Sequence, residues 1–174
     1  MIEIEVKIKI GDAKAVREKL LAWGACIRKE RFYEENTLYD FPDGALYKKK
    51  QALRFRVIDK KAFVTFKGSP QKSRSFKIRE EFESEVRNGP QFKKLLKAIG
   101  LKPVFEYRKH RTFLAKGPLR ICLDETRVGN YIELEGKRSD ITRAAKALGF
   151  SRRDFITLDY VELFRRAENA SPAE

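Results

Sequence analysis

The sequence has 174 residues, of which 42% are hydrophobic and 37% are charged, and its formal net charge is +14. This composition is typical of a folded globular protein and excludes a disordered chain. No apolar run reaches the roughly 20 residues that a membrane-spanning helix needs. The positive charge favours anionic partners such as phosphates, nucleotides or nucleic acid. We predict a single domain over residues 1–168 and a disordered tail over residues 169–174.

Cysteine and histidine are scarce, and this limits the chemistry. Two cysteines, Cys26 and Cys122, are too few for a disulfide framework. The N-terminal residues do not have the pattern of a secretory signal, so we expect a cytoplasmic protein. The single histidine, His110, excludes a histidine-rich metal centre. Any metal must therefore be held by carboxylate oxygens, which suits Mg²⁺, Mn²⁺ or Ca²⁺.

The chain opens on a segment in which apolar and charged residues strictly alternate. In residues 2–10, isoleucine and valine at even positions are separated by Glu3, Glu5, Lys7 and Lys9. This period of two predicts a β-strand with one apolar and one charged face. Apolar residues at helical spacing then follow the potential N-cap Asp12 and predict an amphipathic helix over residues 12–23.

Most of the remaining chain repeats this alternation. The alternating segments are residues 53–58, 62–67, 75–86, 104–115, 119–124 and 130–135, with mixed strand-like pieces between residues 27 and 39. The predicted helices are residues 90–99, 139–148 and 159–167. We expect a turn at 41–44 and a solvated loop at the lysine run 48–50. Turns join most of the strands, which predicts a largely antiparallel sheet.

Each alternating strand places its charged residues on one face. These residues are Glu3, Glu5, Lys7, Arg54, Arg56, Lys67, Arg79, Glu81, Glu83, Lys109, Arg111, Asp124, Glu133 and Glu135. If the helices cover the apolar faces, the charged faces must point into a shared interior. A closed antiparallel barrel achieves this and leaves no exposed sheet edge. We therefore predict an α+β fold in which a barrel with a charged interior is covered by helices.

Buried charges are costly unless they are paired or solvated, so this pattern predicts a hydrated interior that holds a ligand. Residues two apart on a strand are roughly 7 Å apart, and their side chains can converge on one ion or phosphate. The carboxylate pairs suited to divalent cations are Glu3 with Glu5 and Glu133 with Glu135. The pairs suited to successive phosphates are Arg54 with Arg56 and Lys109 with Arg111.

The ordered motifs of this chain resemble the CYTH superfamily, the triphosphate tunnel metalloenzymes. The segment EIEVK at residues 3–7 is similar to the ExExK signature of that superfamily. The other similar segments are NTLYD, LRFR at 53–56, TFKG at 65–68, REEFE at 79–83, KHR at 109–111, CLDE around Asp124, GNYIELE at 129–135 and DYVELF at 159–164. A single ExExK is a weak signal, but the ordered set covers nearly the whole chain.

The resemblance implies an eight-stranded antiparallel β-barrel that binds a triphosphate and uses one or two Mg²⁺ or Mn²⁺ ions. It implies the metal ligands Glu3, Glu5, Asp124, Glu133 and Glu135. The implied phosphate-binding residues are Lys7, Arg54, Arg56, Lys67, Arg79, Lys109 and Arg111. The implied catalytic residues are Glu5, Lys67, Glu81 and Glu83.

The favoured hypothesis is metal-dependent hydrolysis of tripolyphosphate, thiamine triphosphate or a nucleoside triphosphate such as ATP. Class IV adenylate cyclases, which form cyclic AMP and pyrophosphate from ATP, are a close alternative. They resemble one another in a His-Phe pair before ExExK, and only Met1 and Ile2 precede that motif here. We therefore expect hydrolysis over cyclisation.

A non-catalytic module that binds polyphosphate or nucleic acid is a further alternative. A nucleic-acid partner is less expected, because aromatic residues such as Phe55, Phe66 and Phe82 fall on the apolar faces of the strands. No membrane partner is expected. The oligomeric state cannot be read from the sequence, and a dimer is left open.

Overall fold

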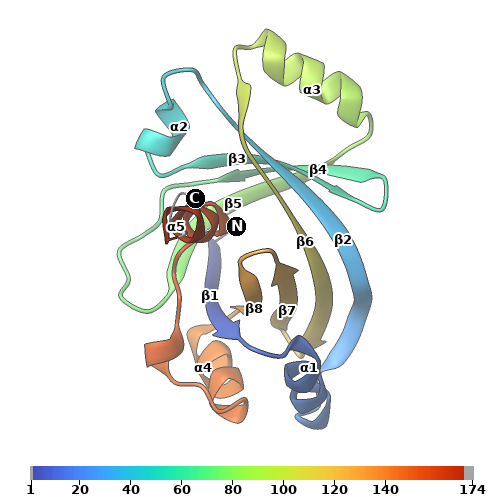
Figure 1. Cartoon of the computed structure of the whole chain (residues 1–174), viewed down its shortest axis with the longest axis vertical. Helices are drawn as coiled ribbons and strands as arrows, with labels where there is room; N and C mark the ends of the chain where they lie inside the picture. The colour runs from blue at the N-terminus through green and yellow to red at the C-terminus, as the bar shows by residue number, and fades with distance from the viewer. Residues whose placement is uncertain (1, 171–174) are drawn as a thin grey trace. The chain divides into compact units, whose positions relative to one another are not determined.

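The computed structural model describes residues 2–170 of the chain (Figure 1). Its strands are β1 (Ile2–Ile10), β2 (Cys26–Asp40), β3 (Ala52–Ile58), β4 (Lys61–Lys67), β5 (Lys77–Val86), β6 (Lys102–Lys116), β7 (Leu119–Thr126) and β8 (Gly129–Glu135). Its helices are α1 (Ala13–Ala22), α2 (Ala45–Lys48), α3 (Gly89–Ala98), α4 (Arg138–Ala147) and α5 (Tyr160–Ala170), with a 3-10 turn at Arg152–Asp154.

The strands are hydrogen-bonded in the order β1-β5-β4-β3-β2-β6-β7-β8 and close into a barrel. The pairs with a described register, such as β3 with β4 and β7 with β8, are antiparallel. This confirms the predicted α+β fold, an eight-stranded antiparallel barrel with helices on its outside. None of the helices within residues 2–170 is long and apolar enough to cross a membrane.

The chain divides into two compact units. The first contains residues 1–3, 32–72 and 78–108, and the second contains residues 4–31, 73–77 and 109–174. Four strands, β1, β2, β5 and β6, contribute residues to both units. The end of the domain at residue 168 stays a prediction.

In the first unit, α3 packs on the apolar face of the β3–β4 hairpin. Leu96 of α3 is buried in one cluster with Phe55 of β3, and the ring of Phe92 stacks on that of Phe55 with centroids 6.2 Å apart. The start of α3 approaches the hairpin closely at Gly89, where a Cβ would lie 3.1 Å from the Phe55 ring and 3.3 Å from Ala62. A larger residue at this position would push α3 away from the sheet.

In the second unit, α1 and α4 cover the apolar faces of β7 and β8. The buried strand residues include Ile121 and Ile132, and α4 adds the fully buried Ile141. Asp12 ends the turn after β1 and caps α1, since its carboxylate accepts hydrogen bonds from the backbone N–H groups of Lys14 and Ala15. The apolar half of the alternating pattern is therefore used for helix packing, which leaves the charged half on the other face.

The structure differs from the sequence-based elements in three places. The mixed segment between residues 27 and 39 is one continuous strand, β2. The lysine run, predicted to be a loop, begins inside the short helix α2 at Lys48. Helix α5 continues to Ala170, two residues into the predicted tail, and residues 171–174 of that tail lie outside the described residues. The first difference concerns a strand of the barrel, whereas the other two lie in a connecting and a terminal segment.

Candidate active site

The charged faces of the strands form one cluster in each unit. The first cluster contains Glu3, Glu34, Arg54, Arg56, Thr65, Lys67, Arg79, Glu81 and Glu83. The second cluster contains Glu5, Lys7, Lys109, Arg111, Asp124, Glu133 and Tyr160. Both clusters are rich in the residues that the sequence singled out for phosphate and metal binding.

Within the first cluster, Glu83 is the acceptor for two arginines. Arg54, Thr65 and Glu83 are cross-strand neighbours on β3, β4 and β5. The Glu83 carboxylate accepts hydrogen bonds from Arg56 at 2.8 Å, from Thr65 at 2.6 Å and from Arg54 at 3.4 Å. Burial raises the pKa of Glu83, but the charge of Arg56 and the hydrogen bond from Thr65 outweigh burial and lower it. Glu83 is therefore held ionised and fixes both guanidinium groups.

Lys67 lies between two carboxyl groups of the same cluster. Its Nζ donates a hydrogen bond to Glu81 and lies 3.5 Å from Glu3 Oε2, and Arg79 Nε lies 3.3 Å from Glu81. Burial raises the pKa of Glu81, but hydrogen bonding with Glu3 and the ammonium group of Lys67 lower it to about 2. A carboxylate with such a low pKa is a weak proton acceptor at neutral pH.

In the second cluster, Lys7 also lies between two carboxylates. Its Nζ is 3.2 Å from Glu5 Oε1 and 3.1 Å from Glu133 Oε2, and the Lys7 side chain is only 4% exposed. Lys7 and Glu133 are opposite each other on β1 and β8, which brings their side chains together. Burial lowers the pKa of Lys7, but Glu133 and Glu5 outweigh burial and raise it, so the side chain stays an ammonium ion.

Asp124 is the centre of the second cluster and is fully buried. It lies opposite Arg111 across β6 and β7, and its two oxygens accept hydrogen bonds from Arg111 Nε and Nη2, both at 2.6 Å. Lys109 Nζ donates to Asp124 Oδ2 at 3.0 Å, and the Tyr160 hydroxyl donates to the same oxygen. Arg111 Nη2 also lies 3.2 Å from Glu133 Oε1. Asp124 thus orients two of the predicted phosphate-binding cations.

Three cluster residues were missed by sequence reasoning, namely Glu34, Thr65 and Tyr160. Glu34 is fully buried on β2, with its Oε2 3.6 Å from Arg56. Glu34 was missed because no alternation was recognised in its segment of the sequence. Thr65 was missed because it is uncharged, and only charged residues were selected as candidates. Tyr160 lies in the DYVELF segment, where an aromatic residue at the start of an amphipathic helix indicates core packing.

Glu135, a predicted metal ligand on β8, forms an ion pair with an arginine of β7. It lies opposite Glu5 on β1 and opposite Arg120 on β7, and its Oε2 is 3.0 Å from Arg120 Nε. The Arg120 side chain is 57% exposed, so this ion pair is close to solvent. The predicted roles of Glu135 and of the other site residues stay predictions.

The donor chemistry of the clusters fits a divalent metal. Among residues 2–170, no group of three His, Cys, Asp or Glu side chains is placed to hold a metal ion together. Instead, an ammonium group lies between Glu5 and Glu133, and another between Glu3 and Glu81. Carboxylate oxygens are the donors that Mg²⁺ and Mn²⁺ prefer. Each carboxylate pair already binds the ammonium group of one lysine. A divalent metal ion that displaced this ammonium group would meet two carboxylates.

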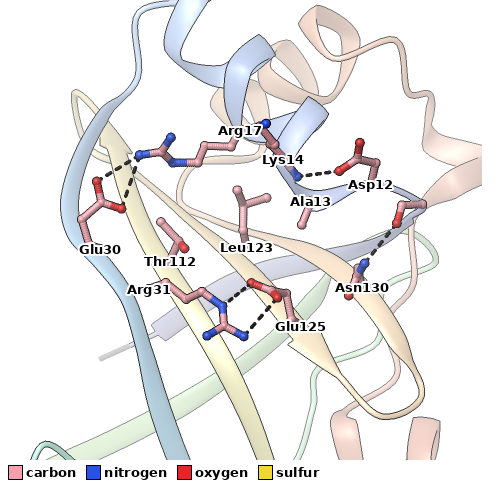
Figure 2. Close-up of a pocket in the computed structure, with 11 residues that line it drawn as sticks. Asp12, Ala13, Lys14, Arg17, Glu30, Arg31, Thr112, Leu123, Glu125 and Asn130 are labelled. Atoms are coloured by element: carbon pink, nitrogen blue, oxygen red, sulfur yellow. Dashed lines mark hydrogen bonds and ion pairs between the residues drawn. The ribbon is translucent and has the colours of Figure 1, made fainter.

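A pocket of about 600 Å³ lies elsewhere in the second unit, beside the N-terminus of α1 (Figure 2). Arg17 pairs with Glu30 at 3.0 Å and Arg31 pairs with Glu125 at 2.9 Å along its wall. Glu125 follows Asp124 on β7, so the pocket is on the opposite face of that strand from the second cluster. Its ion pairs are exposed and each stabilises by at most about 1 kcal/mol. We therefore take the charged cluster of each unit, and not this pocket, as its candidate functional site.

Solved structures from several organisms, among them the following two, share the fold of most of this chain. A structure from Vibrio parahaemolyticus, described as a "putative adenylate cyclase", has a TM-score of 0.84 and 18% identity, and covers 95% of this chain and 98% of its own. A structure from Hippeastrum, described as a "Putative adenylyl cyclase HpAC1" with a dominant triphosphatase activity, has a TM-score of 0.71 and 19% identity, and covers 95% of each chain. At these identities the likeness shows the fold alone.

The sequence comparisons are more specific. The chain is 32% identical to a Methanocaldococcus jannaschii protein named "Putative adenylate cyclase", over 94% of this chain and 98% of that protein. The CYTH domain matches residues 1–152. This match covers most of the chain and includes both charged clusters except Tyr160. The chain therefore belongs to the CYTH domain family, as its motifs predicted.

Proposed function

We propose that this protein is a divalent-metal-dependent enzyme that hydrolyses a small triphosphate, such as tripolyphosphate, thiamine triphosphate or a nucleoside triphosphate. The observation that carries the proposal is the state of Lys7, a buried ammonium ion between Glu5 and Glu133. This arrangement places one ammonium group, which can bind phosphate, beside two carboxylates, which can bind a metal ion. CYTH family members are triphosphatases or adenylate cyclases, which supports an enzyme of this type.

The basic residues are suited to phosphate because they are already oriented. Arg111 is held by Asp124 through two parallel hydrogen bonds, and Arg54 and Arg56 are held by Glu83. A guanidinium group fixed in one plane presents its remaining N–H donors to phosphate oxygens with little further loss of side-chain entropy. We assign Lys7, Lys109 and Arg111 in the second unit to phosphate binding. Arg54 and Arg56 have the same assignment in the first unit.

In this mechanism the carboxylates divide into two classes. Glu5 and Glu133 would hold the metal, which supplies neutralising charge on phosphate oxygens and a polarised water as nucleophile. Glu81 and Glu83 have lowered pKa values and already accept hydrogen bonds from basic residues, so we assign them to orienting Lys67 and the arginines. Asp124 has the same task toward Lys109 and Arg111.

Adenylate cyclase activity is a second candidate, favoured by the name of the relative that is 32% identical. The same cations would bind the phosphates of ATP, and the ribose 3′-hydroxyl would replace water as the nucleophile. The two reactions are separated by their products, because hydrolysis releases phosphate whereas cyclisation releases pyrophosphate and cyclic AMP.

A substrate panel tests the proposal directly. The protein is incubated with Mg²⁺ or Mn²⁺ and with tripolyphosphate, thiamine triphosphate or ATP in turn, and phosphate, pyrophosphate and cyclic AMP are measured. We expect phosphate release, highest with one of these substrates, that stops when a chelator removes the metal. If none of the substrates yields any of the three products, the enzymatic function is wrong.

The charge balance of the second cluster predicts that metal and substrate bind together. Its three cations are Lys7, Lys109 and Arg111, and its three carboxylates are Glu5, Asp124 and Glu133. A phosphate that takes the cations alone leaves buried carboxylates without counter-charge, which a divalent ion would supply. We expect tripolyphosphate to bind at least about tenfold more tightly with Ca²⁺ or Mn²⁺ than with sodium at equal ionic strength, a typical coupling between two sites.

Calorimetric titration under both conditions measures this coupling. An equal affinity with and without the divalent ion would contradict it, and would show that the cations bind phosphate without help from a metal.

A further inference from the structure

Tyr160, at the start of α5, is buried among the charged groups of the second cluster. Its side chain is only slightly exposed, at 4%. The hydroxyl donates a hydrogen bond to Asp124 Oδ2, and the ring centroid lies 4.4 Å from Lys109 Nζ and 5.2 Å from Lys7 Nζ. One side chain therefore contacts a carboxylate and two ammonium groups that we assign to the site.

The contacts of Tyr160 are more numerous than helix docking requires. Helix α5 is also anchored by Phe164, which is 1% exposed, and by the ion pair of Asp159 with Lys77 at 3.4 Å. Asp159 caps the helix as well, since its carboxylate accepts a hydrogen bond from Glu162 N–H at 3.0 Å. Because these contacts hold α5 in place, removing the Tyr160 hydroxyl should leave the helix docked.

The two parts of the Tyr160 side chain constrain the cluster differently. The hydroxyl donates to Asp124 Oδ2, the oxygen that also accepts hydrogen bonds from Lys109 and Arg111. It therefore helps to hold the Asp124 carboxylate in one orientation. The ring attracts the ammonium groups of Lys7 and Lys109 through its π-face, an interaction that strengthens when water is excluded. Loss of either part would widen the range of positions that the two lysines sample.

We propose that Tyr160 is a positioning residue, which holds Lys7, Lys109 and Asp124 in the arrangement that binds the phosphates of the substrate. This inference rests on the proposed function, because it takes Lys7 and Lys109 as phosphate-binding groups. It makes helix α5, which follows the matched CYTH region, a part of the active site. Tyr160 acts through its neighbours and does not need to contact the substrate.

The test compares Tyr160→Phe, Tyr160→Leu and Phe164→Leu in tripolyphosphate hydrolysis, in calorimetric binding of tripolyphosphate with Ca²⁺, and in thermal unfolding. We expect Tyr160→Phe to raise KM and Kd about tenfold, a typical coupling between two sets of contacts, with kcat within about twofold. The lost hydrogen bond to Asp124 is internal to the protein, so Tm should also fall, but by no more than in Phe164→Leu. Tyr160→Leu also removes the ring and should weaken binding further. Phe164→Leu should lower Tm and leave KM unchanged.

The outcomes separate the positioning role from the function on which it rests. If the wild-type protein neither binds nor hydrolyses tripolyphosphate, thiamine triphosphate or ATP, the proposed function is wrong. If the wild type is active and Tyr160→Phe keeps the wild-type KM and Kd, the positioning role is wrong. An equal rise of KM in Phe164→Leu would also overturn it, because docking of α5 alone would then explain the effect.

Discussion

Replacing Asp124 with alanine is expected to lower the free energy of unfolding by about 3–5 kcal/mol and to abolish triphosphate hydrolysis. Asp124 is fully buried and accepts hydrogen bonds from Arg111, Lys109 and Tyr160. Its removal takes away the carboxylate that Lys109 and Arg111 share, although Arg111 keeps its contact with Glu133 at 3.2 Å. Uncompensated buried positive charge costs more than the ion pairs themselves contribute. Urea unfolding and phosphate release measure the two effects.

The neighbouring residue provides a matched control for this change. Glu125→Ala removes a carboxylate one position further along β7, where its partner Arg31 is 51% exposed. An exposed ion pair stabilises by at most about 1 kcal/mol, so this variant should be nearly as stable and as active as the wild type. If Asp124→Ala had the same free energy of unfolding as the wild type, the central role of this carboxylate would be wrong.

Glu5→Gln is expected to reduce hydrolysis at least about 100-fold, because metal affinity falls by more than the 10- to 100-fold typical of losing an outer-shell partner. The amide keeps the shape of the side chain, and Lys7 keeps its contact with Glu133 at 3.1 Å, so the variant should remain folded. Mn²⁺ titration by calorimetry and hydrolysis at several Mn²⁺ concentrations separate weak metal binding from a slow reaction.

Glu30→Gln is the control for this second change, since it makes the same substitution at an exposed carboxylate paired with Arg17 in the pocket beside α1. This variant should bind Mn²⁺ and hydrolyse substrate like the wild type. Full activity and unchanged Mn²⁺ affinity in Glu5→Gln would exclude Glu5 as a metal ligand.

The sequence was sufficient to predict the strands other than β2, together with their charged faces. Alternation determines the face on which a side chain lies, whatever the neighbouring strands are, so Lys7, Arg111 and Glu83 could be assigned to charged faces directly. The antiparallel barrel also followed, because helices can cover only the apolar face and a closed sheet has no edge. The ordered motifs then indicated the family that the sequence match confirms.

The partners of each charged residue could not be predicted, because they depend on register between strands that are distant in the sequence. A shift of β8 by two residues against β1 would place Tyr131 or Glu135 opposite Lys7 instead of Glu133. Alternation does not exclude this shift, because every side chain stays on the same face. Tyr160 was missed for another reason. Its place in an amphipathic helix is equally compatible with packing against an apolar surface, and only the fold brings charged groups to its ring.

The ammonium group of Lys7, bound between two carboxylates, has a consequence for how the protein responds to salt. The lysine acts as a built-in counterion, so the cluster needs no sodium ion or ordered shell of mobile ions to remain neutral. A ligand that enters therefore exchanges one fixed partner for another and releases few ions to the solvent. Affinity for the triphosphate should then depend less steeply on ionic strength than the net charge of +14 suggests.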